Sequence, residues 1–428
     1  MKTILFPYNT DILKYEINES RLQGELISKI HNYSAEKNQE ELVRNALETP
    51  VGTPRLSIMA EGKKKIVLIA SDHTRPVPSK IIVPQMLAEI RKGSPNAEIT
   101  ILVATGCHRE TTKSELESKF GKEILKWEKI VIHNCDSNDM AYLGKLPSGG
   151  ELIINRLAAD AELLVAEGFI EPHFFAGFSG GRKSVFPGLA SRKAVLYNHN
   201  AEFISCPGSR TGNIDNNPIH NDMLYAARKA RLDFICNVII NTKKEVIYAV
   251  AGDCDLAHRQ GREFLIRECS VKPAMADIVI STNGGYPLDQ NIYQAVKGMT
   301  AAEATVKKGG VIIHLSASCD GHGAPEFYKT FAEEKDLNSM LSAFMKTPKE
   351  KTRIDQWQSQ ILARILKHAH VIFISEANDK MVEDFHMIPA HSIDEAVKKA
   401  EGILKNPNAS ITVIPDGISV IVKNDTTG

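Results

Sequence analysis

Short apolar strands alternate with helical segments along most of this 428-residue chain, and that alternation limits the fold more than any other feature. KIVLIASD (Lys65–Asp72), EITILVATG (Glu98–Gly106) and ELLVAEGFI (Glu162–Ile170) have the dense apolar content of parallel strands that are covered on both faces. Helical patterns near Ile81–Lys92 and Ser114–Lys126 follow the first two. Strands that alternate with helices predict an α/β fold with mostly parallel sheets flanked by helices.

The alternation starts again in the second half of the chain, which predicts a second sheet. A hairpin of Asp233–Asn241 with Lys244–Asp253 and a helix near Leu256–Glu268 end the first half. Four later strands are expected at Ala276–Asn283, Gly309–Ala317, His370–Glu376 and Ser410–Gly417. Because 428 residues exceed one ordinary core, we predict an amino-terminal domain of residues 1–270 and a carboxy-terminal domain of residues 271–428. The active site is expected in the cleft between them.

The segment before Lys65 is less regular. It is predicted to contain a short β segment and two helices, around Gln23–Ser34 and Gln39–Leu47. Its apolar start is short and interrupted by Asp11, which differs from a secretory signal. No run in the chain has the length that a membrane-spanning helix requires.

Charge and cysteine content narrow the classes of partner and compartment. Lys and Arg together number 52, as do Asp and Glu, so no overall field draws the chain toward nucleic acid or an anionic membrane. The seven cysteines are scattered and include no Cys-x-x-Cys pair, which is typical of reduced intracellular thiols. We therefore expect a cytoplasmic protein with a small-molecule ligand and with neither nucleic-acid nor membrane partners.

Polar residues follow the first two strands at their carboxyl ends, where open α/β sheets bind ligands. After the first come Asp72, Arg75 and Pro76, and the Arg75 guanidinium could hold a carboxylate through two parallel bonds. A turn capped by Asp72, with Pro76 opening a helix, is the structural alternative. His108 follows the second strand. A single histidine is more often structural, but this one is expected beside the first cluster.

The third polar cluster is a glycine-rich segment, EPHFFAGFSGGRKS (Glu171–Ser184). Its backbone donors, hydroxyl and lysine are the ingredients of a phosphate-binding loop, and they are supplied by Gly177, Ser179, Gly180, Gly181 and Lys183. The spacing fits neither the Walker pattern nor the dinucleotide fingerprint, and glycine also serves tight turns. Because His173 and His199 flank the lysine, a purely structural role does not account for the segment.

Candidate site residues in the second half are fewer. In YQAVKG (Tyr293–Gly298), Gln294 and Lys297 would share one face of a helix, either toward a site or toward solvent. Trp357 is one of two tryptophans, and ordinary packing is its structural alternative.

Five motifs occur in order along most of the chain: SDHTRPVP (Ser71–Pro78), ATGCHRETT (Ala104–Thr112), EPHFFAGFSGGRKSVFPG (Glu171–Gly188), NH (Asn198–His199) and YQAVKG (Tyr293–Gly298). Together they resemble the motif set of the nickel-dependent lactate racemase family. The long third motif is the most specific of them.

The resemblance implies a cofactor, a nickel-pincer nucleotide, which is a pyridinium-3-thioamide-5-thiocarboxylic acid mononucleotide carrying nickel. By motif position, Lys183 is similar to the lysine that can bind this cofactor covalently, and His199 is similar to the nickel ligand. Asp72 and the Ser179–Gly181 loop would hold the nucleotide and its phosphate. The resemblance also implies that separate cofactor-biosynthesis proteins supply the group.

The resemblance further implies inversion of C2 in a small 2-hydroxy acid, lactate or a close relative, by hydride transfer to and from the cofactor. His108 and His173 would act as the two acid/base residues, and Arg75 would anchor the substrate carboxylate. Additional contacts with cofactor and substrate would come from Tyr293, Gln294, Lys297 and Trp357. Three alternatives stay open at this point: an epimerase of a larger 2-hydroxy acid such as a sugar acid, a metal-dependent hydrolase or lyase, and a nucleotide-binding protein without enzymatic activity.

Overall fold

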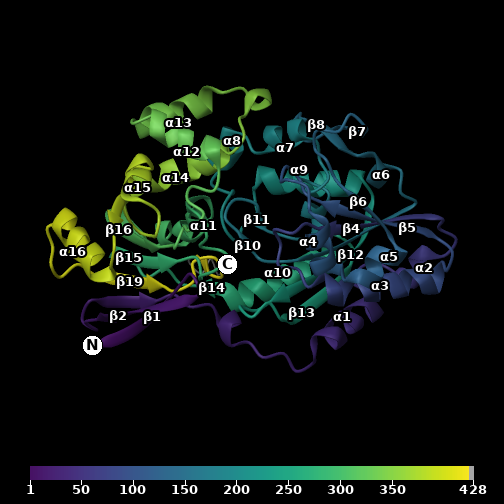
Figure 1. The fold of residues 1–428 in the computed structure, drawn as a ribbon, viewed down its shortest axis with the longest axis horizontal. Coiled ribbons are helices and arrows are strands. Elements are labelled where there is room, and N and C mark those ends of the chain that lie inside the picture. Colours follow the sequence, from purple (N-terminus) through teal and green to yellow (C-terminus); the bar gives the residue numbers. More distant parts are fainter. Residues whose placement is uncertain (424–428) are drawn as a thin grey trace.

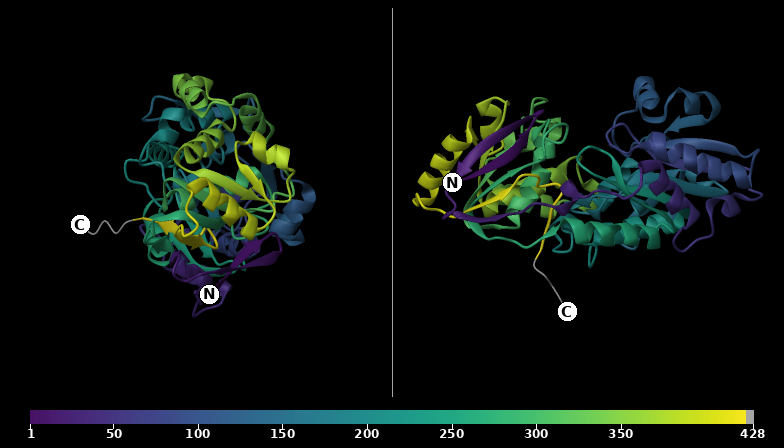
Figure 2. Two further views of the ribbon diagram at one scale, coloured as in Figure 1. Left: turned by 90° about the vertical axis from the view of Figure 1, so that its left-hand side faces the viewer. Right: turned by 90° about the horizontal axis from the view of Figure 1, so that it is seen from below.

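Two six-stranded sheets form two lobes that lie side by side (Figures 1 and 2) in the computed structural model, which describes residues 1–423. The first sheet has the strand order β13-β12-β9-β4-β5-β6. Its strands are β4 (Lys65–Ser71), β5 (Glu98–Ala104), β6 (Lys129–Ile132), β9 (Leu163–Phe169), β12 (Leu232–Ile240) and β13 (Val246–Gly252). All neighbours are parallel except β12 and β13, which form the predicted antiparallel hairpin.

Helices cover both faces of this first sheet. Along β4, Ile66 and Leu68 belong to one apolar cluster and Val67 and Ile69 to another, as expected where side chains alternate between two buried faces. The first cluster includes residues of α1 (Gln39–Glu48) and α3 (Ser79–Gly93). The second includes residues of α9 (Pro218–Lys229) and α10 (Leu256–Cys269). The predicted α/β class is confirmed.

The second sheet is parallel throughout and has the order β18-β17-β16-β15-β19-β3. Its strands are β3 (Leu22–Glu25), β15 (Ala276–Thr282), β16 (Val306–Leu315), β17 (His370–Ile374), β18 (Ile388–Ala390) and β19 (Ile411–Ile414). The hairpin of β1 (Lys2–Tyr8) and β2 (Asp11–Ile17) packs on the same lobe, where Phe6 shares a buried cluster with Ile278. Figure 2 shows this hairpin beside the carboxy-terminal elements.

The amino-terminal segment differs from its prediction. The helix expected around Gln23–Ser34 is wrong, because β3 pairs with β19 and only a short 3-10 turn (Lys29–Asn32) follows. The amide of Leu26 continues the pairing by donating to the carbonyl of Val413 at 2.9 Å. Backbone bonds to an exposed strand edge outweigh the weak local preference for a helix. The first residues thus belong with the second sheet, whereas the boundary near residue 270 stays a prediction.

The lobes are joined by packing as well as by the chain. One buried apolar cluster runs through both lobes. At their contact, the buried amide of Gln360 on α14 (Gln356–His368) donates to the carbonyl of Ala201 at 2.8 Å.

Within residues 1–423, no helix combines the length and apolarity that crossing a membrane would take.

The strand order of the first sheet determines where a ligand can bind. β4 is followed along the chain by β5 on one side, while β9 pairs on its other side. Such a reversal opens a crevice at the carboxyl ends of the two central strands. Here those ends are Ser71 and Phe169, which lead directly into the first and third sequence motifs.

Candidate active site

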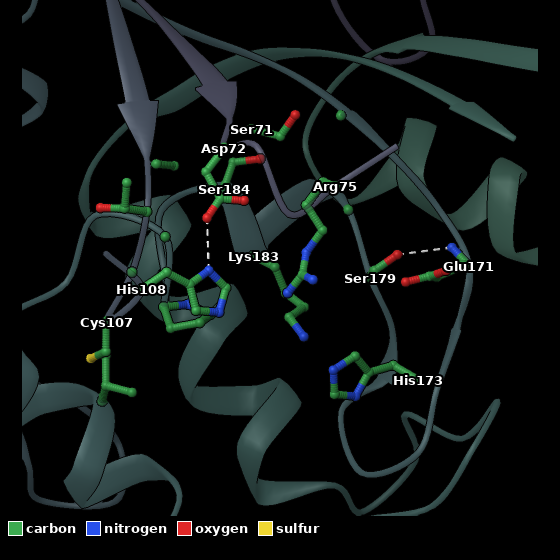
Figure 3. Close-up of a pocket in the computed structure, with 18 of the residues that line it drawn as sticks. Ser71, Asp72, Arg75, Cys107, His108, Glu171, His173, Ser179, Lys183 and Ser184 are labelled. Atoms are coloured by element: carbon green, nitrogen blue, oxygen red, sulfur yellow. Dashed lines mark hydrogen bonds and ion pairs between the residues drawn. The ribbon is translucent and has the colours of Figure 1, made fainter. Parts of the chain in front are cut away.

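A cavity of about 290 Å³ lies beyond the carboxyl ends of β4, β5 and β9 and is closed from the other lobe by α11 (Ile292–Glu303) and the start of α14. Figure 3 shows part of its lining. The predicted site residues that line it are Asp72, Arg75, His108, His173, Ser179, Gly180, Lys183, His199, Tyr293, Gln294, Lys297 and Trp357. Gly181 does not line it. The structure thus brings together residues that are spread along most of the chain.

Four charged side chains line the cavity without a hydrogen-bond or ion-pair partner in the described part of the chain. Those of Arg75, Lys183, Lys297 and Glu171 make no hydrogen bond or ion pair within residues 1–423. Burial lowers the pKa of Lys297 to about 8, Arg75 lowers it further and Glu171 opposes the shift. Burial, with Arg182 and Arg75, also lowers the pKa of Lys183 well below its usual value. Charged groups without protein partners are costly unless a ligand engages them.

His108 is oriented by Asp72. Its Nδ1 lies 2.7 Å from Asp72 Oδ2 (Figure 3). The other carboxylate oxygen accepts from the Thr74 hydroxyl at 2.7 Å. Burial alone would raise the pKa of Asp72, but the hydrogen bonds from His108 and Thr74 lower it to about 2. Because a carboxylate can only accept, Nδ1 carries the proton of a neutral ring and Nε2 keeps its lone pair. Asp72, predicted to contact a nucleotide, is therefore engaged by protein donors.

His173 has the opposite arrangement of ring nitrogens. It lies in a tight hairpin in which β10 (Pro172–His173) pairs with β11 (Gly177–Phe178), and its Nδ1 accepts from the amide of Ala176 at 3.3 Å. Burial, followed by Lys183 and Lys297, lowers its pKa well below the usual value. The ring is thus neutral, with its proton on Nε2.

His199 ends α7 (Arg192–Asn198) and is enclosed by aromatic rings. The centroids of Phe175 and Trp357 lie 5.2 and 5.0 Å from its own, both edge-on. Its Nδ1 is buried without a well-formed hydrogen bond. Burial lowers the pKa of His199 to about 3; Lys183 adds to the shift and the Val195 carbonyl opposes it. A neutral imidazole is the form that binds metal ions. Among residues 1–423, no three or more His, Cys, Asp and Glu side chains form a metal-binding group.

The glycine-rich loop is folded tightly onto the sheet. The Ser179 hydroxyl donates to the carbonyl of Phe169 at 3.1 Å and accepts from the amide of Glu171 at 2.9 Å. The amide of Gly181 donates to Asn237 Oδ1 at 2.7 Å. Gly180 has φ 72°, and a Cβ there would lie 2.7 Å from the Phe169 carbonyl oxygen, so only glycine fits. The Ser179 hydroxyl and the Gly181 amide thus donate within the protein, and the predicted phosphate-binding role of the loop stays a prediction.

The second lobe presents one face of α11 to the cavity. Gln294 and Lys297 both line it, so the sequence interpretation as a site face applies and the solvent-facing alternative does not. The helix begins at the Asn291 cap, whose side chain accepts from the amide of Gln294 at 2.9 Å. Trp357 Nε1 donates to the Tyr293 hydroxyl at 3.2 Å, which fixes the aromatic wall.

Two acidic residues of the site were missed by sequence reasoning. Glu167 on β9 is 1% exposed, and its Oε1 accepts from the amide and hydroxyl of Ser71, both at 2.8 Å, and from the Ser79 hydroxyl at 3.2 Å. It thereby ties both ends of the loop that carries Asp72 and Arg75. The sequence signal that could have revealed Glu167 is a single acidic residue within an otherwise apolar strand. Glu171 was quoted within its motif but given no role, although it follows the end of β9.

Comparisons with known proteins identify the family of the chain. A model of the lactate racemase N-terminal domain matches residues 8–212, and a model of the lactate racemase C-terminal domain matches residues 271–422. The chain is 51% identical over 425 residues to the lactate racemase of Thermoanaerobacterium thermosaccharolyticum, covering 99% of this chain and 100% of the relative. It is 50% identical over 426 residues to the lactate racemase of Lactiplantibacillus plantarum, with the same coverage.

Solved structures give the same result. The lactate racemase apoprotein from Thermoanaerobacterium thermosaccharolyticum superimposes with a TM-score of 0.96 at 50% sequence identity, covering 99% of this chain and 100% of that one. A protein from Thermotoga maritima shares the fold alone, with a TM-score of 0.64 at 19% identity, covering 91% of this chain and 100% of its own. On sequence, domain content and fold together, the chain belongs to the lactate racemase family.

Proposed function

We propose that this protein is a lactate racemase, an isomerase that interconverts D- and L-lactate. One observation carries the proposal beyond family membership: His108 and His173 line a single cavity together with the Arg75 guanidinium, which has no hydrogen-bond or ion-pair partner among residues 1–423. The full-length identity to two lactate racemases supports lactate as the substrate. The seven free cysteine thiols support a cytoplasmic location.

Arg75 and Lys297 are suited to bind the carboxylate of lactate. Both are cationic, both line the cavity from different lobes, and neither is paired within residues 1–423. A guanidinium can hold a carboxylate through two parallel bonds and so fix the orientation of the substrate. Binding between the lobes would also exclude water from the reacting carbon.

The two histidines are suited to move the hydroxyl proton of the substrate. His108 has a free acceptor at Nε2 because Asp72 holds its Nδ1 proton, so it can take the proton from a lactate hydroxyl. His173 carries its proton on Nε2 because Nδ1 accepts from the Ala176 amide, so it can present a proton to oxygen. Opposite enantiomers place their hydroxyl groups differently around a fixed carboxylate and C2, which gives each histidine a separate use.

The residues present fit a nickel-pincer nucleotide. His199 offers one neutral imidazole whose Nδ1 has no well-formed partner, and Lys183 offers an amine whose lowered pKa favours the nucleophilic, unprotonated form. We propose that His199 binds nickel and that Lys183 attaches the nucleotide. When bound, the cofactor would supply a hydride acceptor and donor for C2 of the substrate. Separate biosynthetic proteins would provide it.

Replacing Asp72 with Asn is expected to lower kcat for lactate by about 10²–10⁴-fold, with nickel content unchanged. The Asn amide would donate to His108 Nδ1 and move the ring proton to Nε2, which removes the acceptor. Initial rates and metal analysis on the same preparation check this. Loss of bound nickel instead would restore the interpretation of Asp72 as a nucleotide contact.

Lys297 is expected to impose an alkaline limit on activity. A lysine is cationic below its pKa, and burial lowers the pKa of Lys297 to about 8, so its charge is lost as the pH rises through that value. We expect kcat/KM for lactate to fall about tenfold per pH unit above pH 8. In Lys297→Met, kcat/KM should be lower throughout and lack this limb. An unchanged limb in the variant would assign it to another group.

The experiment that tests the proposed function is a substrate panel on protein co-expressed with the cofactor-making proteins. Chiral chromatography would follow lactate, larger 2-hydroxy acids and sugar acids. We expect lactate to be the best substrate. Activity on a sugar acid but none on lactate would favour the epimerase alternative, and a loaded protein inactive on the whole panel would contradict the proposal.

A further inference from the structure

Glu171 is the acidic member of the four unpaired charges in the cavity. It lies two residues beyond β9, at the crevice between β4 and β9. In Figure 3 its carboxylate extends from the cavity wall toward the region of Arg75 and Lys183. Its backbone is fixed, since its amide donates to the Ser179 hydroxyl at 2.9 Å and its carbonyl accepts from the Ser179 amide at 2.9 Å. The fold therefore fixes the backbone from which the carboxylate extends, while its oxygens have no hydrogen-bond or ion-pair partner within the described residues.

No nearby cation forms an ion pair with the Glu171 carboxylate within the described residues. Lys297, Arg75 and Lys183 act on it electrostatically, but none forms an ion pair with it within residues 1–423. Burial, which disfavours the charged form, raises its pKa and outweighs these cations, and Asp416 adds to the rise. A carboxylate kept in this state in a binding cavity indicates a role toward a ligand.

The chemistry of a carboxylate restricts what that ligand group can be. A carboxylate accepts hydrogen bonds at two oxygens, so the ligand must bring donors. The lactate carboxylate and a phosphate would be repelled, and the single lactate hydroxyl is needed at the histidines. A vicinal diol offers two donors at the spacing of the two oxygens. Open α/β sheets bind ligands at such crevices, and in the dinucleotide-binding members of that class an acidic side chain accepts from a ribose hydroxyl.

We propose that Glu171 binds the ribose hydroxyl groups of the nucleotide that this cavity holds. The inference rests on the proposed function, because it takes a nucleotide as the ligand. Glu171 would accept hydrogen bonds from neutral hydroxyl groups of the nucleotide, whereas Arg75 would donate hydrogen bonds to the substrate carboxylate. Together they would orient nucleotide and substrate in one cavity.

The test measures nucleotide binding to the full chain prepared without cofactor. Isothermal titration would use nicotinamide mononucleotide, a pyridinium mononucleotide, and its 2′-deoxy analogue. Glu171→Gln keeps the side-chain shape and removes the charge. A hydrogen bond to a charged group is worth enough to predict about a tenfold or greater loss of affinity for the ribonucleotide. The wild type should also prefer the ribonucleotide by about tenfold, and the variant should lose this preference.

Glu98→Gln, at an exposed carboxylate whose contact is an ion pair with Lys129, serves as the matched control and should bind both nucleotides like the wild type. Thermal unfolding should show that Glu171→Gln is as stable as the wild type, because its carboxylate bonds to no protein group. Wild-type binding with equal affinity in Glu171→Gln would overturn the inference. A wild type that binds neither nucleotide would also overturn it. Failure of the proposed function would appear separately, as a loaded enzyme that leaves lactate unchanged.

Discussion

Replacing His108 or His173 with Ala is expected to lower lactate racemisation by about 10²–10⁴-fold in each variant, the range attributed to a positioned acid or base. The two effects should be similar in size, because one complete inversion needs a proton taken at one histidine and a proton given at the other. Nickel content should remain that of the wild type, since neither ring is the proposed metal ligand. Initial rates from both enantiomers, with metal analysis of the same samples, check this.

His391→Ala is the matched control for these variants. His391 is exposed, pairs with Asp379 at 3.4 Å and does not line the cavity, so its loss should leave the rate unchanged. A fully active His108→Ala or His173→Ala variant would remove that residue from the acid/base role. Loss of nickel in His173→Ala would instead assign that ring to the metal.

Replacing Lys183 with Ala is expected to abolish covalent attachment of the nucleotide completely. The amine is the nucleophile of the proposed linkage, and burial with the nearby Arg182 and Arg75 lowers its pKa, which favours the reactive, unprotonated form. Intact-mass measurement of the co-expressed protein should show the added cofactor mass in the wild type and none in the variant.

Lys193→Ala provides the control for Lys183, because this exposed lysine pairs with Glu151 at 2.7 Å and does not line the cavity. It should carry the same added mass as the wild type. An unchanged adduct on Lys183→Ala would contradict the attachment site. An adduct lost from both variants would point to impaired loading and would be resolved by measuring nucleotide in the denatured supernatant.

The sequence predicts the central part of this fold because the relevant patterns are local. Buried parallel strands such as Lys65–Ser71 are apolar almost throughout, and their carboxyl ends mark the crevice. The sequence alone therefore predicts Arg75 and His108 in one site. The pairing of β3 with β19 could not, because it joins the two ends of the chain and depends on an edge that exists only in the folded lobe.

The hydrogen-bond partners of individual site residues could not be predicted from the sequence either. The sequence does not show which side chain Asp72 pairs with, and its 2.7 Å contact with His108 is visible only in the folded protein. Ser179 and Gly181 match the composition of a phosphate-binding loop. In the folded protein the Ser179 hydroxyl donates to the Phe169 carbonyl and the Gly181 amide donates to the Asn237 side chain. The proposed role of Glu171 rests on a carboxylate without a bonded partner among residues 1–423, which only the folded cavity reveals.

The measurement that tests the central claim most directly is the approach to equilibrium from each pure enantiomer of lactate, using cofactor-loaded protein and chiral chromatography. Enantiomers have equal free energies, so a racemase must bring both samples to equal amounts of D- and L-lactate. We predict that the two time courses converge on this ratio. Protein that carries nickel and nucleotide but leaves both pure enantiomers unchanged would contradict the claim.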